Sequence, residues 1–284
     1  MEGSDPEDIF SSSLESLYDY QPVTLASAGS KYTYTSNLSK KGDSQEVNNR
    51  TEPLKIVLTT PDTLAANWFL HASDIWAASL YLANHLDFLD LDSIANGRPE
   101  KIRVLELGAA AGLPGILLAK TCAQAIVTVS DYPDVKLIET LSENIFRNGV
   151  SDSCRVIAYA WGADAHVLTG GGDGFDLVLA ADTLWNPDLH VLFIATLRMT
   201  LRKSLSSRVH LVAGLHTGRY TIQSFINTAQ KAGLELEDTL EKEVSGKGER
   251  LWDVTRWDEE EDRERRRWVV WMVLKWGEHQ LTGG

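Results

Sequence analysis

The sequence predicts an α/β protein: a Rossmann-like, doubly wound sheet of seven mostly parallel strands with an antiparallel last strand. Two observations carry this prediction. Short apolar strand patterns alternate with helical patterns about five times along the chain, which is typical of a parallel sheet covered by helices. Two further strand patterns then close the chain with a charged loop between them, so we expect an antiparallel hairpin at the edge of the sheet or inserted into it.

The chain has 284 residues, enough for one large domain or two small ones. Residues 1–50 are rich in Ser, Asp, Asn and Gly, and four tyrosines interrupt this polar stretch. The composition predicts a largely disordered N-terminal arm with one docking segment. Residues 51–284 are expected to form a single domain, which begins with a short strand at 55–59 in a hairpin or at an edge.

Composition limits the classes of partner and the compartment. The formal net charge of −13 argues against nucleic acid as the main partner, because phosphate binding requires clustered Lys and Arg, and it favours a basic partner. No apolar run approaches the roughly 18 residues of a membrane span, and residues 1–10 lack a secretion signal. Cys122 and Cys154 fit neither a disulfide framework nor a metal site. We therefore expect a monomer without a metal, in the cytoplasm or alternatively the nucleus.

The first strand, at 101–107, leads through a loop of small residues into a helix at 113–121. Small residues in such a turn let the backbone approach a ligand closely, and the start of the helix offers N–H groups to an anion. A nucleotide-like ligand is therefore the first hypothesis for this loop. An ordinary buried strand and turn is the alternative.

The glycine pattern distinguishes two kinds of nucleotide cofactor. A dinucleotide-binding turn has Gly at its first, third and sixth positions. Counting from Gly108, the third and sixth positions are Ala110 and Leu113, so the dinucleotide pattern fails. An acid two residues before the first glycine and a glycine at the fifth position, here Glu106 and Gly112, resemble the first motif of S-adenosylmethionine (AdoMet) methyltransferases.

Asp131 ends the second strand, at 125–130, and completes a strand–helix–strand unit. An acid at this position accepts hydrogen bonds from the ribose hydroxyls of a bound nucleoside. The alternative role is to cap the following helix at 134–148, since Asp-Tyr-Pro-Asp is also good capping chemistry. Asp134 is suited to the same cap, which would leave Asp131 free for the ligand.

Two later strands end in residues suited to the same site. Trp161 and Gly162 follow the third strand, at 155–160, and Asp182 and Trp185 follow the fourth. Ligands of open parallel sheets bind at these carboxyl ends, so we expect the loops to face one crevice. An aromatic ring there can flank an adenine, although Trp161 is equally compatible with a core position.

A helical pattern within residues 68–89 precedes the first strand. Apolar residues from Trp76 onward repeat at helical spacing, and Ser73 or Asp74 is suited to cap the helix. Such a helix would lie over the cofactor loop and place Trp76 beside it. A core position for Trp76 is the alternative.

The rest of the chain completes the alternating pattern. Residues 170–174 (Gly-Gly-Gly-Asp-Gly) follow no strand directly and are expected to form a surface loop. The charged run at 258–267 is expected to be a solvated loop or a frayed helix. The remaining elements are expected at 175–181 (fourth strand), 187–202 (helix), 208–213 (fifth strand), 221–232 (helix), 234–244 (sixth strand) and 268–276 (last strand).

Taken together, these pieces resemble the seven-strand AdoMet-dependent methyltransferases. More narrowly, they resemble the protein-lysine methyltransferase group called methyltransferase family sixteen, over residues 68–276. The nearest branch is the fungal one that includes the nicotinamide N-methyltransferase-like proteins and the elongation-factor N-terminal and lysine methyltransferases. The motifs that carry the resemblance are the Trp76 helix, Glu106-Leu-Gly-Ala, Val129-Ser-Asp131-Tyr, Trp161-Gly162 and Asp182-Thr-Leu-Trp185.

The resemblance implies a role for each motif. Trp76 would cover the cofactor, Asp131 would bind its ribose and Trp161 its adenine. Asp182 stands where the family has an acid, and Trp185 stands where it has an aromatic residue, usually Tyr or Phe; these two are the candidates for catalysis. The other residues expected to contact AdoMet are Glu106, Gly108 and Ala109 at its methionine end, together with Tyr132, Gly162 and Ala181.

The activity implied is AdoMet-dependent methylation of a lysine or N-terminal amine of a protein, with a translation elongation factor as a candidate. A small-molecule, nicotinamide-like N-methyltransferase and a non-catalytic AdoMet-binding module are the alternatives. Because the cofactor brings an activated methyl group, the protein mainly positions and desolvates a neutral amine. Asp182 is suited to orient that amine, and Trp185 to wall it by cation–π contact.

Overall fold

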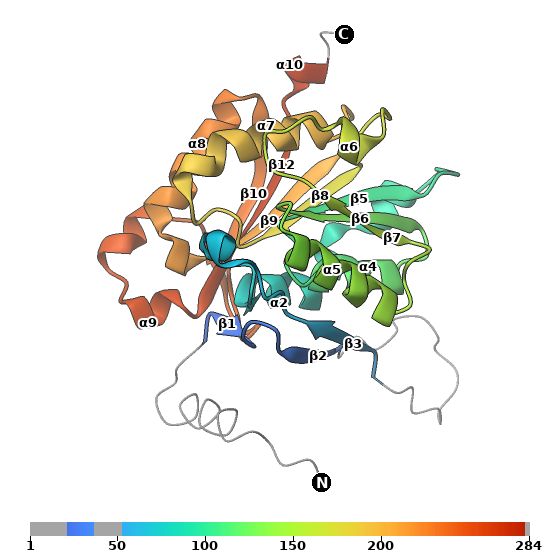
Figure 1. Cartoon of the computed structure of the whole chain (residues 1–284). Helices are drawn as coiled ribbons and strands as arrows, with labels where there is room; N and C mark the ends of the chain where they lie inside the picture. The colour runs from blue at the N-terminus through green and yellow to red at the C-terminus, as the bar shows by residue number, and fades with distance from the viewer. Residues whose placement is uncertain (1–21, 37–52, 282–284) are drawn as a thin grey trace, which may run out of the picture.

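The computed structural model describes residues 22–36 and 53–281. At its centre is an eight-stranded sheet with the order β11-β10-β12-β9-β8-β5-β6-β7, and helices cover both faces (Figure 1). The predicted α/β class and doubly wound arrangement are confirmed. The strands of this sheet are β5 (Ile102–Leu107), β6 (Ala125–Asp131), β7 (Cys154–Ala158), β8 (Leu177–Ala181), β9 (Arg208–Gly214), β10 (Leu234–Glu243), β11 (Glu249–Leu251) and β12 (Trp268–Trp276).

The remaining elements of residues 22–36 and 53–281 are five longer helices, several short helical turns and two small strand pairs. The longer helices are α2 (Ala77–Asn84), α4 (Leu113–Thr121), α5 (Val135–Arg147), α7 (His190–Thr200) and α8 (Arg219–Lys231). The short turns are η1 (Ala65–Leu70), η2 (Leu86–Leu89), α3 (Leu91–Ala95), α6 (His166–Thr169), η3 (Pro187–Leu189), η4 (Leu215–Thr217), η5 (Val254–Asp258), α9 (Asp262–Arg265) and α10 (Glu278–Leu281). The strand pairs are β1 (Thr24–Leu25) with β4 (Ile75–Trp76), and β2 (Lys31–Thr35) with β3 (Lys55–Thr59).

Five neighbouring strands, β9-β8-β5-β6-β7, run parallel to one another. Both faces of these strands are apolar because both are covered. Within β5, Val104 belongs to the hydrophobic core shared with α2, α4 and α5, whereas the next residue, Leu105, belongs to the core shared with α7 and α8. The alternation of side chains along one strand thus supplies two cores.

Strand β12 is antiparallel to both of its neighbours, β9 and β10, and lies inside the sheet. The expected antiparallel last strand is therefore confirmed. Strand β11 adds an eighth strand that the sequence did not predict, by pairing with β10 at the edge. A three-residue strand is too short to produce a periodic pattern in the sequence.

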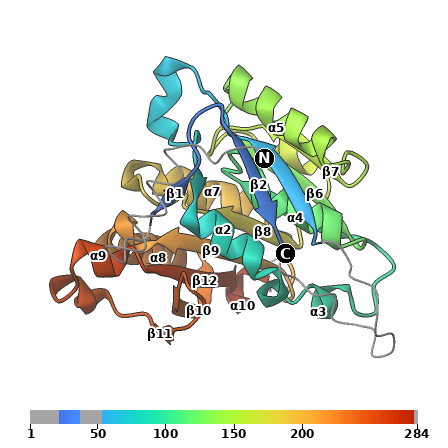
Figure 2. The same ribbon diagram turned by 90° about the horizontal axis from the view of Figure 1, so that it is seen from below.

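Two short strands from residues 22–36, β1 and β2, pair with segments of the main domain. The β2–β3 ribbon lies beside α4 and α5 (Figure 2). The other edge of β3 is closed by Asn144 and Asn148, near the end of α5, whose side-chain amides exchange hydrogen bonds with the backbone of Thr59 and Val57. The rest of the predicted N-terminal arm, residues 1–21 and 37–50, lies outside the described residues.

The helix predicted within residues 68–89 is interrupted in the structure. The turn η1 comes first, and then Trp76 is extended (φ −81°, ψ 147°) because it belongs to β4 and pairs with β1. The helix α2 therefore begins at Ala77, and neither Ser73 nor Asp74 caps it. The prediction of one capped helix was wrong here, since a pairing with a distant strand overrides the local helical spacing.

The charged run at 258–267 contains one acid, Glu260, whose side chain is only 7% exposed. Arg219, the first residue of α8, is fully buried and pairs with Glu241 of β10 at 2.5 Å and with Glu260 at 2.7 Å. Arg250 pairs with both carboxylates as well. The prediction of a solvated run is wrong for Glu260, because the sequence does not show which acid meets a buried arginine.

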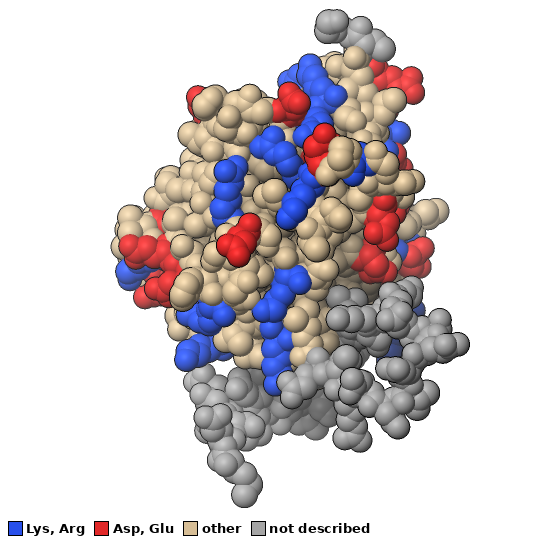
Figure 3. Space-filling view, turned by 90° about the vertical axis from the view of Figure 1, so that its right-hand side faces the viewer, with Lys and Arg blue, Asp and Glu red and all other residues tan. Residues whose placement is uncertain are grey.

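Charged side chains of both signs are spread among uncharged ones on the face of the molecule that is on the right-hand side of Figure 1 (Figure 3). Near the starts of the parallel strands, two arginines form ion pairs with one buried acid: Asp176, just before β8, pairs with Arg98 and Arg202. The glycine-rich stretch at 170–174 forms the expected loop next to these residues in sequence. Among the described residues, none of the helices has the length and apolar character needed to cross a membrane.

Candidate active site

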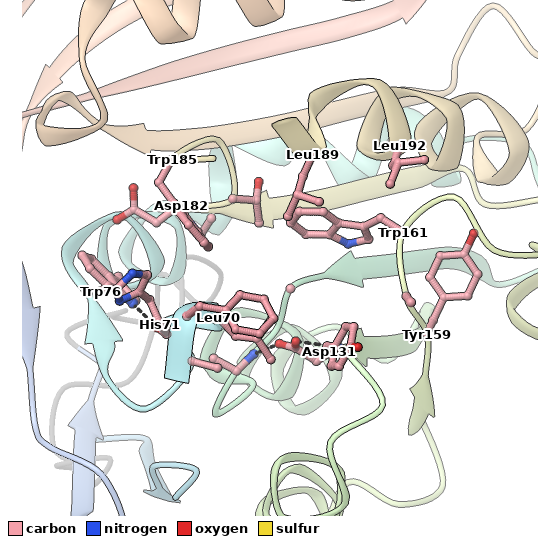
Figure 4. Close-up of a pocket in the computed structure, with 18 residues that line it drawn as sticks. Leu70, His71, Trp76, Asp131, Tyr159, Trp161, Asp182, Trp185, Leu189 and Leu192 are labelled. Atoms are coloured by element: carbon pink, nitrogen blue, oxygen red, sulfur yellow. Dashed lines mark hydrogen bonds between the residues drawn. The ribbon is translucent and has the colours of Figure 1, made fainter. Parts of the chain in front are cut away.

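A cavity of about 350 Å³ lies at the carboxyl ends of β5, β6, β7 and β8 (Figure 4). This volume falls within the range of roughly 300–1,000 Å³ that is usual for small-molecule pockets. The end of η1 and the segment that leads from it to β4 also line the cavity. The predicted site residues that line it are Trp76, Gly108, Asp131, Tyr132, Trp161, Ala181, Asp182 and Trp185.

A smaller cavity of about 20 Å³ adjoins the first and shares Trp76, Gly108, Ala110 and Ala181 with it. Glu106 and Ala109 line this smaller cavity. The two cavities together form an elongated site that runs from the loop after β7 to the start of α4. An elongated cofactor with a nucleoside at one end and an amino acid at the other has this outline.

Gly108 forms the floor where the two cavities meet. Its φ is +67°, and a Cβ at this position would lie 2.8 Å from Cγ2 of Thr183 and 3.4 Å from Cζ2 of Trp161. Glycine is therefore required both by the left-handed backbone and by the close approach of the neighbouring loops. A bare backbone at this point leaves room for a ligand between the strand ends.

The Asp131 carboxylate is buried at the tip of β6 and faces the cavity. Its Oδ2 accepts a hydrogen bond from the N–H of Ala110, and its Oδ1 accepts one from the N–H of Tyr132, each at 2.7 Å. Burial raises the pKa of Asp131 to about 6, although these two hydrogen bonds lower it. Asp134 is the residue that caps α5, by accepting from Leu137 N–H at 3.0 Å, so the capping role expected as an alternative for Asp131 is taken.

Glu106 is completely buried at the end of β5, where its Oε2 accepts a hydrogen bond of 2.9 Å from the N–H of Gly115 in the first turn of α4. Burial raises the pKa of Glu106 to about 8; the bond from Gly115 lowers it, and the neighbouring Asp131 raises it further. The Glu106 carboxyl group thus accepts a hydrogen bond from one of the free N–H groups at the start of α4, and it also borders the smaller cavity.

Trp161 both lines the cavity and packs on the core, so the two interpretations left open by the sequence are compatible. Its ring contacts Phe193 of α7 at a centroid distance of 4.6 Å. Gly162 lines neither cavity: its N–H donates to Thr196 Oγ1 at 2.8 Å, and a Cβ there would lie 2.7 Å from Cδ2 of Leu192. The structure therefore does not place Gly162 at the ligand, as was expected. The absence of a side chain at Gly162 instead lets α7 approach the loop that carries Trp161.

Three aromatic rings enclose the opposite end of the cavity. His71 meets the edge of Trp185 at 4.9 Å and that of Trp76 at 6.3 Å, and its carbonyl accepts a hydrogen bond of 2.8 Å from the Trp76 indole. His71 was not predicted as a site residue. His71 is distinguished by its backbone and not by a sequence pattern: its φ is +52°. A positive φ is uncommon for residues other than glycine, and such strained residues cluster at functional sites.

Asp182 also adopts a left-handed conformation, with φ +52°, at the end of β8. Its Oδ1 accepts a hydrogen bond of 2.7 Å from Gly214 N–H, whereas its buried Oδ2 has no hydrogen-bond partner among the described residues. Burial raises the pKa of Asp182, while His216, Gly214 and the N–H of Ala78 lower it. The helix that follows is capped by Asn186, so a capping role for Asp182 is excluded.

The side chains around the cavity fit a nucleoside with a cationic arm. An acid lies at the ribose position, an aromatic ring lies at one end, and the lining contains the carboxylates of Asp131 and Asp182 but no Lys or Arg among the described residues. Aromatic walls and unpaired carboxylate oxygens suit cations and amines. Fold and site together define a Rossmann-like cofactor-binding protein of the methyltransferase class.

The particular family follows from comparison with known proteins. A model of the lysine methyltransferase family matches residues 69–232 of the 284, and the chain belongs to this family. It is therefore a methyltransferase, and membership implies AdoMet as the methyl donor. The matched segment begins within η1, ends just after α8 and contains every residue that lines the two cavities.

Two relatives show how far the similarity extends. The chain is 28% identical over 207 residues to the protein N-terminal and lysine N-methyltransferase efm7 of Schizosaccharomyces pombe, covering 69% of this chain and 75% of that protein. It is 32% identical over 166 residues to EFM7 of Debaryomyces hansenii, covering 55% of this chain and 61% of that protein. Among solved structures, the fibrillarin pre-rRNA processing protein of Methanococcus jannaschii is 13% identical, with a TM-score of 0.47, covering 87% of this chain and 90% of that chain.

Proposed function

We propose that this protein transfers a methyl group from AdoMet to an amine nitrogen of a protein substrate, either a lysine side chain or an N-terminal α-amine. The observation that carries the proposal is Oδ2 of Asp182, a buried acceptor without a partner among the described residues, beside Trp76 and Trp185 in the cavity. Leaving such an acceptor unpaired costs about 1–3 kcal/mol, so the site is suited to the N–H of an incoming amine.

The cofactor site in this proposal is the remainder of the cavity. Asp131 binds the ribose hydroxyls, Trp161 flanks the adenine, and Gly108 and Glu106 lie at the methionine end. When bound, AdoMet supplies a methyl group activated by a sulfonium sulfur. Burial raises the pKa of both Glu106 and Asp131, and the positive charge of a bound sulfonium would favour the ionised forms of these two carboxyl groups.

The residues at the other end prepare the acceptor. A lysine amine has a pKa of about 10.4 in water and must lose a proton before its nitrogen can attack. The rings of His71, Trp76 and Trp185 exclude water, which disfavours the charged ammonium form. Oδ2 of Asp182 accepts one N–H and fixes the direction of the nitrogen lone pair.

The names of the relatives support the kind of substrate that we propose for this chain. Both relatives described above are named protein N-terminal and lysine N-methyltransferases, and we propose the same kind of acceptor for this chain. A translation elongation factor is the specific candidate, and the net charge of −13 favours a basic segment around the target amine. We further propose that the protein acts as a monomer in the cytoplasm, without nucleic acid or membrane.

Transfer of label from methyl-labelled AdoMet tests this function. The acceptor is a lysate from cells that lack the protein, and the enzymes compared are the natural protein, Asp182→Asn and, as a matched control, the exposed Asp188→Asn. We expect labelled protein bands with the natural protein and the Asp188 variant, and at least about tenfold less label with the Asp182 variant. Mapping of the labelled residue then identifies the amine.

Two outcomes would contradict the proposal in different ways. Label found only in small molecules would indicate a small-molecule N-methyltransferase. AdoMet binding by calorimetry without any transfer would indicate a cofactor-binding interaction module.

A further inference from the structure

His216 lies on η4, just behind the wall of the cavity that it does not itself line. Its imidazole stacks on the Trp76 ring at a centroid distance of 5.3 Å and an interplanar angle of 19°. Its Nε2 lies 3.8 Å from Oδ1 of Asp182. One side chain therefore contacts both the aromatic wall and the carboxylate to which the acceptor site is assigned.

The backbone at the end of β9 is adapted to this arrangement. Gly214 donates its N–H to Oδ1 of Asp182, and a Cβ at this position would overlap the imidazole ring of His216. Glycine at 214 therefore admits the ring of His216 against the strand end. Gly214 and His216 therefore both approach Oδ1. The N–H of Ala78 also acts on the Asp182 carboxylate, and Oδ2 has no hydrogen-bond partner among the described residues.

The other charged groups near η4 are committed elsewhere. Helix α8 contributes Arg219, which is paired with Glu241 and Glu260. Helix α9, which contacts η4, carries both positive and negative side chains. Strand β12 also contacts η4, and its residue paired with Gly214 is the apolar Val269. The charged residues of α9 are Asp262, Arg263, Glu264 and Arg265, of which Asp262 pairs with Arg265, and Glu264 pairs with Arg267 and accepts from Trp268.

Trp76 also contacts His71, whose ring is perpendicular to the indole, and His71 interacts electrostatically with Asp74. His216 instead stacks on the indole with the two ring planes nearly parallel. Among the charge effects on Asp182, that of His216 is the largest one that favours the ionised carboxylate.

We propose that His216 is a positioning residue: it braces the Trp76 ring and holds the Asp182 carboxylate so that an ionised, fixed Oδ2 faces the acceptor amine. This inference rests on the proposed function, since it assigns His216 a part in the same acceptor site. It predicts two separable effects, one through ring stacking on Trp76 and one through charge on Asp182.

Two substitutions separate these effects. His216→Phe keeps a ring to stack on Trp76 and removes the ionisable nitrogens, whereas His216→Gln keeps a polar group and removes the ring. The exposed His166 on α6 supplies the matched control, His166→Phe. Each protein is compared with the natural one by thermal melting, by calorimetric AdoMet affinity, and by ¹³C NMR titration of the Asp182 carboxyl, which is assigned from its absence in Asp182→Asn.

For His216→Phe we expect the Asp182 carboxyl to titrate about one pH unit higher, because the electrostatic effect of His216 that lowers the pKa of Asp182 is lost, with AdoMet affinity within about twofold. For His216→Gln we expect AdoMet affinity to fall about threefold or more through loss of the stacked ring. An Asp182 titration that is the same in His216→Phe and in the His166 control would overturn the proposal. These readouts need no acceptor, so a failed label-transfer experiment would count against the function and leave this result separate.

Discussion

The carboxylate of Asp131 accepts a hydrogen bond of 2.7 Å from the backbone N–H of Ala110. This bond joins the tip of β6 to the loop after β5, at a residue whose φ is +48°. A non-glycine residue in the left-handed region costs about 1–2 kcal/mol, and the bond to a buried carboxylate offsets part of that cost. The cofactor loop is therefore held in shape by the same side chain to which we assign the ribose.

Asp131→Ala should weaken AdoMet binding by about tenfold or more. Each hydrogen bond from a ribose hydroxyl to the carboxylate contributes about 1.5–3 kcal/mol, and alanine removes them all. Calorimetric titration measures the affinity, and thermal melting shows whether the lost bonds to Ala110 and Tyr132 also loosen the loop. The exposed Asp164→Ala is the control; equal affinities in the two variants would remove Asp131 from the cofactor site.

Asp182→Asn should lower turnover by about tenfold or more and leave AdoMet affinity nearly unchanged. The asparagine can still accept from Gly214, but it no longer offers a charged oxygen to the amine. Turnover is measured with labelled AdoMet on the mapped substrate, next to Asp188→Asn. Normal turnover of a stable Asp182→Asn protein would exclude Asp182 from the reaction.

Gly108→Ala should reduce both stability and cofactor affinity, because the added methyl group would press on Thr183 and on Trp161 in the cavity. The positive φ alone costs about 1–2 kcal/mol. Gly97→Ala separates the two effects, since Gly97 has a φ of +74° and nothing within 4 Å of a Cβ. We expect Gly108→Ala to melt at a lower temperature than Gly97→Ala, because only Gly108→Ala adds the clash with Thr183. We expect at least about tenfold weaker AdoMet binding for Gly108→Ala alone; equal affinities in the two variants would contradict a cofactor contact at Gly108.

Glu106 should make the free protein less stable as the pH rises. Its folded-state pKa of about 8 lies above the value of about 4.3 for an unfolded chain. Between these values the folded state binds more protons, so this stabilising contribution is complete below about pH 4 and is lost progressively up to about pH 8. Glu106→Gln cannot ionise, and its melting temperature should rise relative to the natural protein between pH 5 and about pH 8. The exposed Glu139→Gln should show no such trend.

Arg219→Ala should destabilise the protein by about 3–5 kcal/mol, because it leaves the buried carboxylates of Glu241 and Glu260 short of a partner. Urea unfolding measures the change, with the exposed Arg198→Ala as the control. A decrease in the free energy of unfolding of less than about 1 kcal/mol would mean that Arg250 and Arg256 compensate the carboxylates without Arg219.

The sequence by itself determined the fold class and where most of the site would lie. A chain of alternating apolar strands and helices forms a parallel sheet, and in such a sheet every strand delivers its last residues to one edge. Asp131, Trp161 and Asp182 could thus be placed in one crevice from their positions after strands alone. The separation of roles between Asp131 and Asp134 was also predictable, since two acids flank one proline and only one is needed for the cap.

Only the tertiary structure decided the contacts between loops that are far apart in the chain. Trp76 is extended because β1 pairs with it, His71 reaches Trp185 across more than a hundred residues, and Glu260 is buried because Arg219 lies opposite. None of these has a period or a spacing that sequence analysis can detect. These contacts depend on which side chains meet when the strands and helices pack together. Oδ2 of Asp182 is suited to bind a ligand because the fold removes it from water and gives it no hydrogen-bond partner among the described residues.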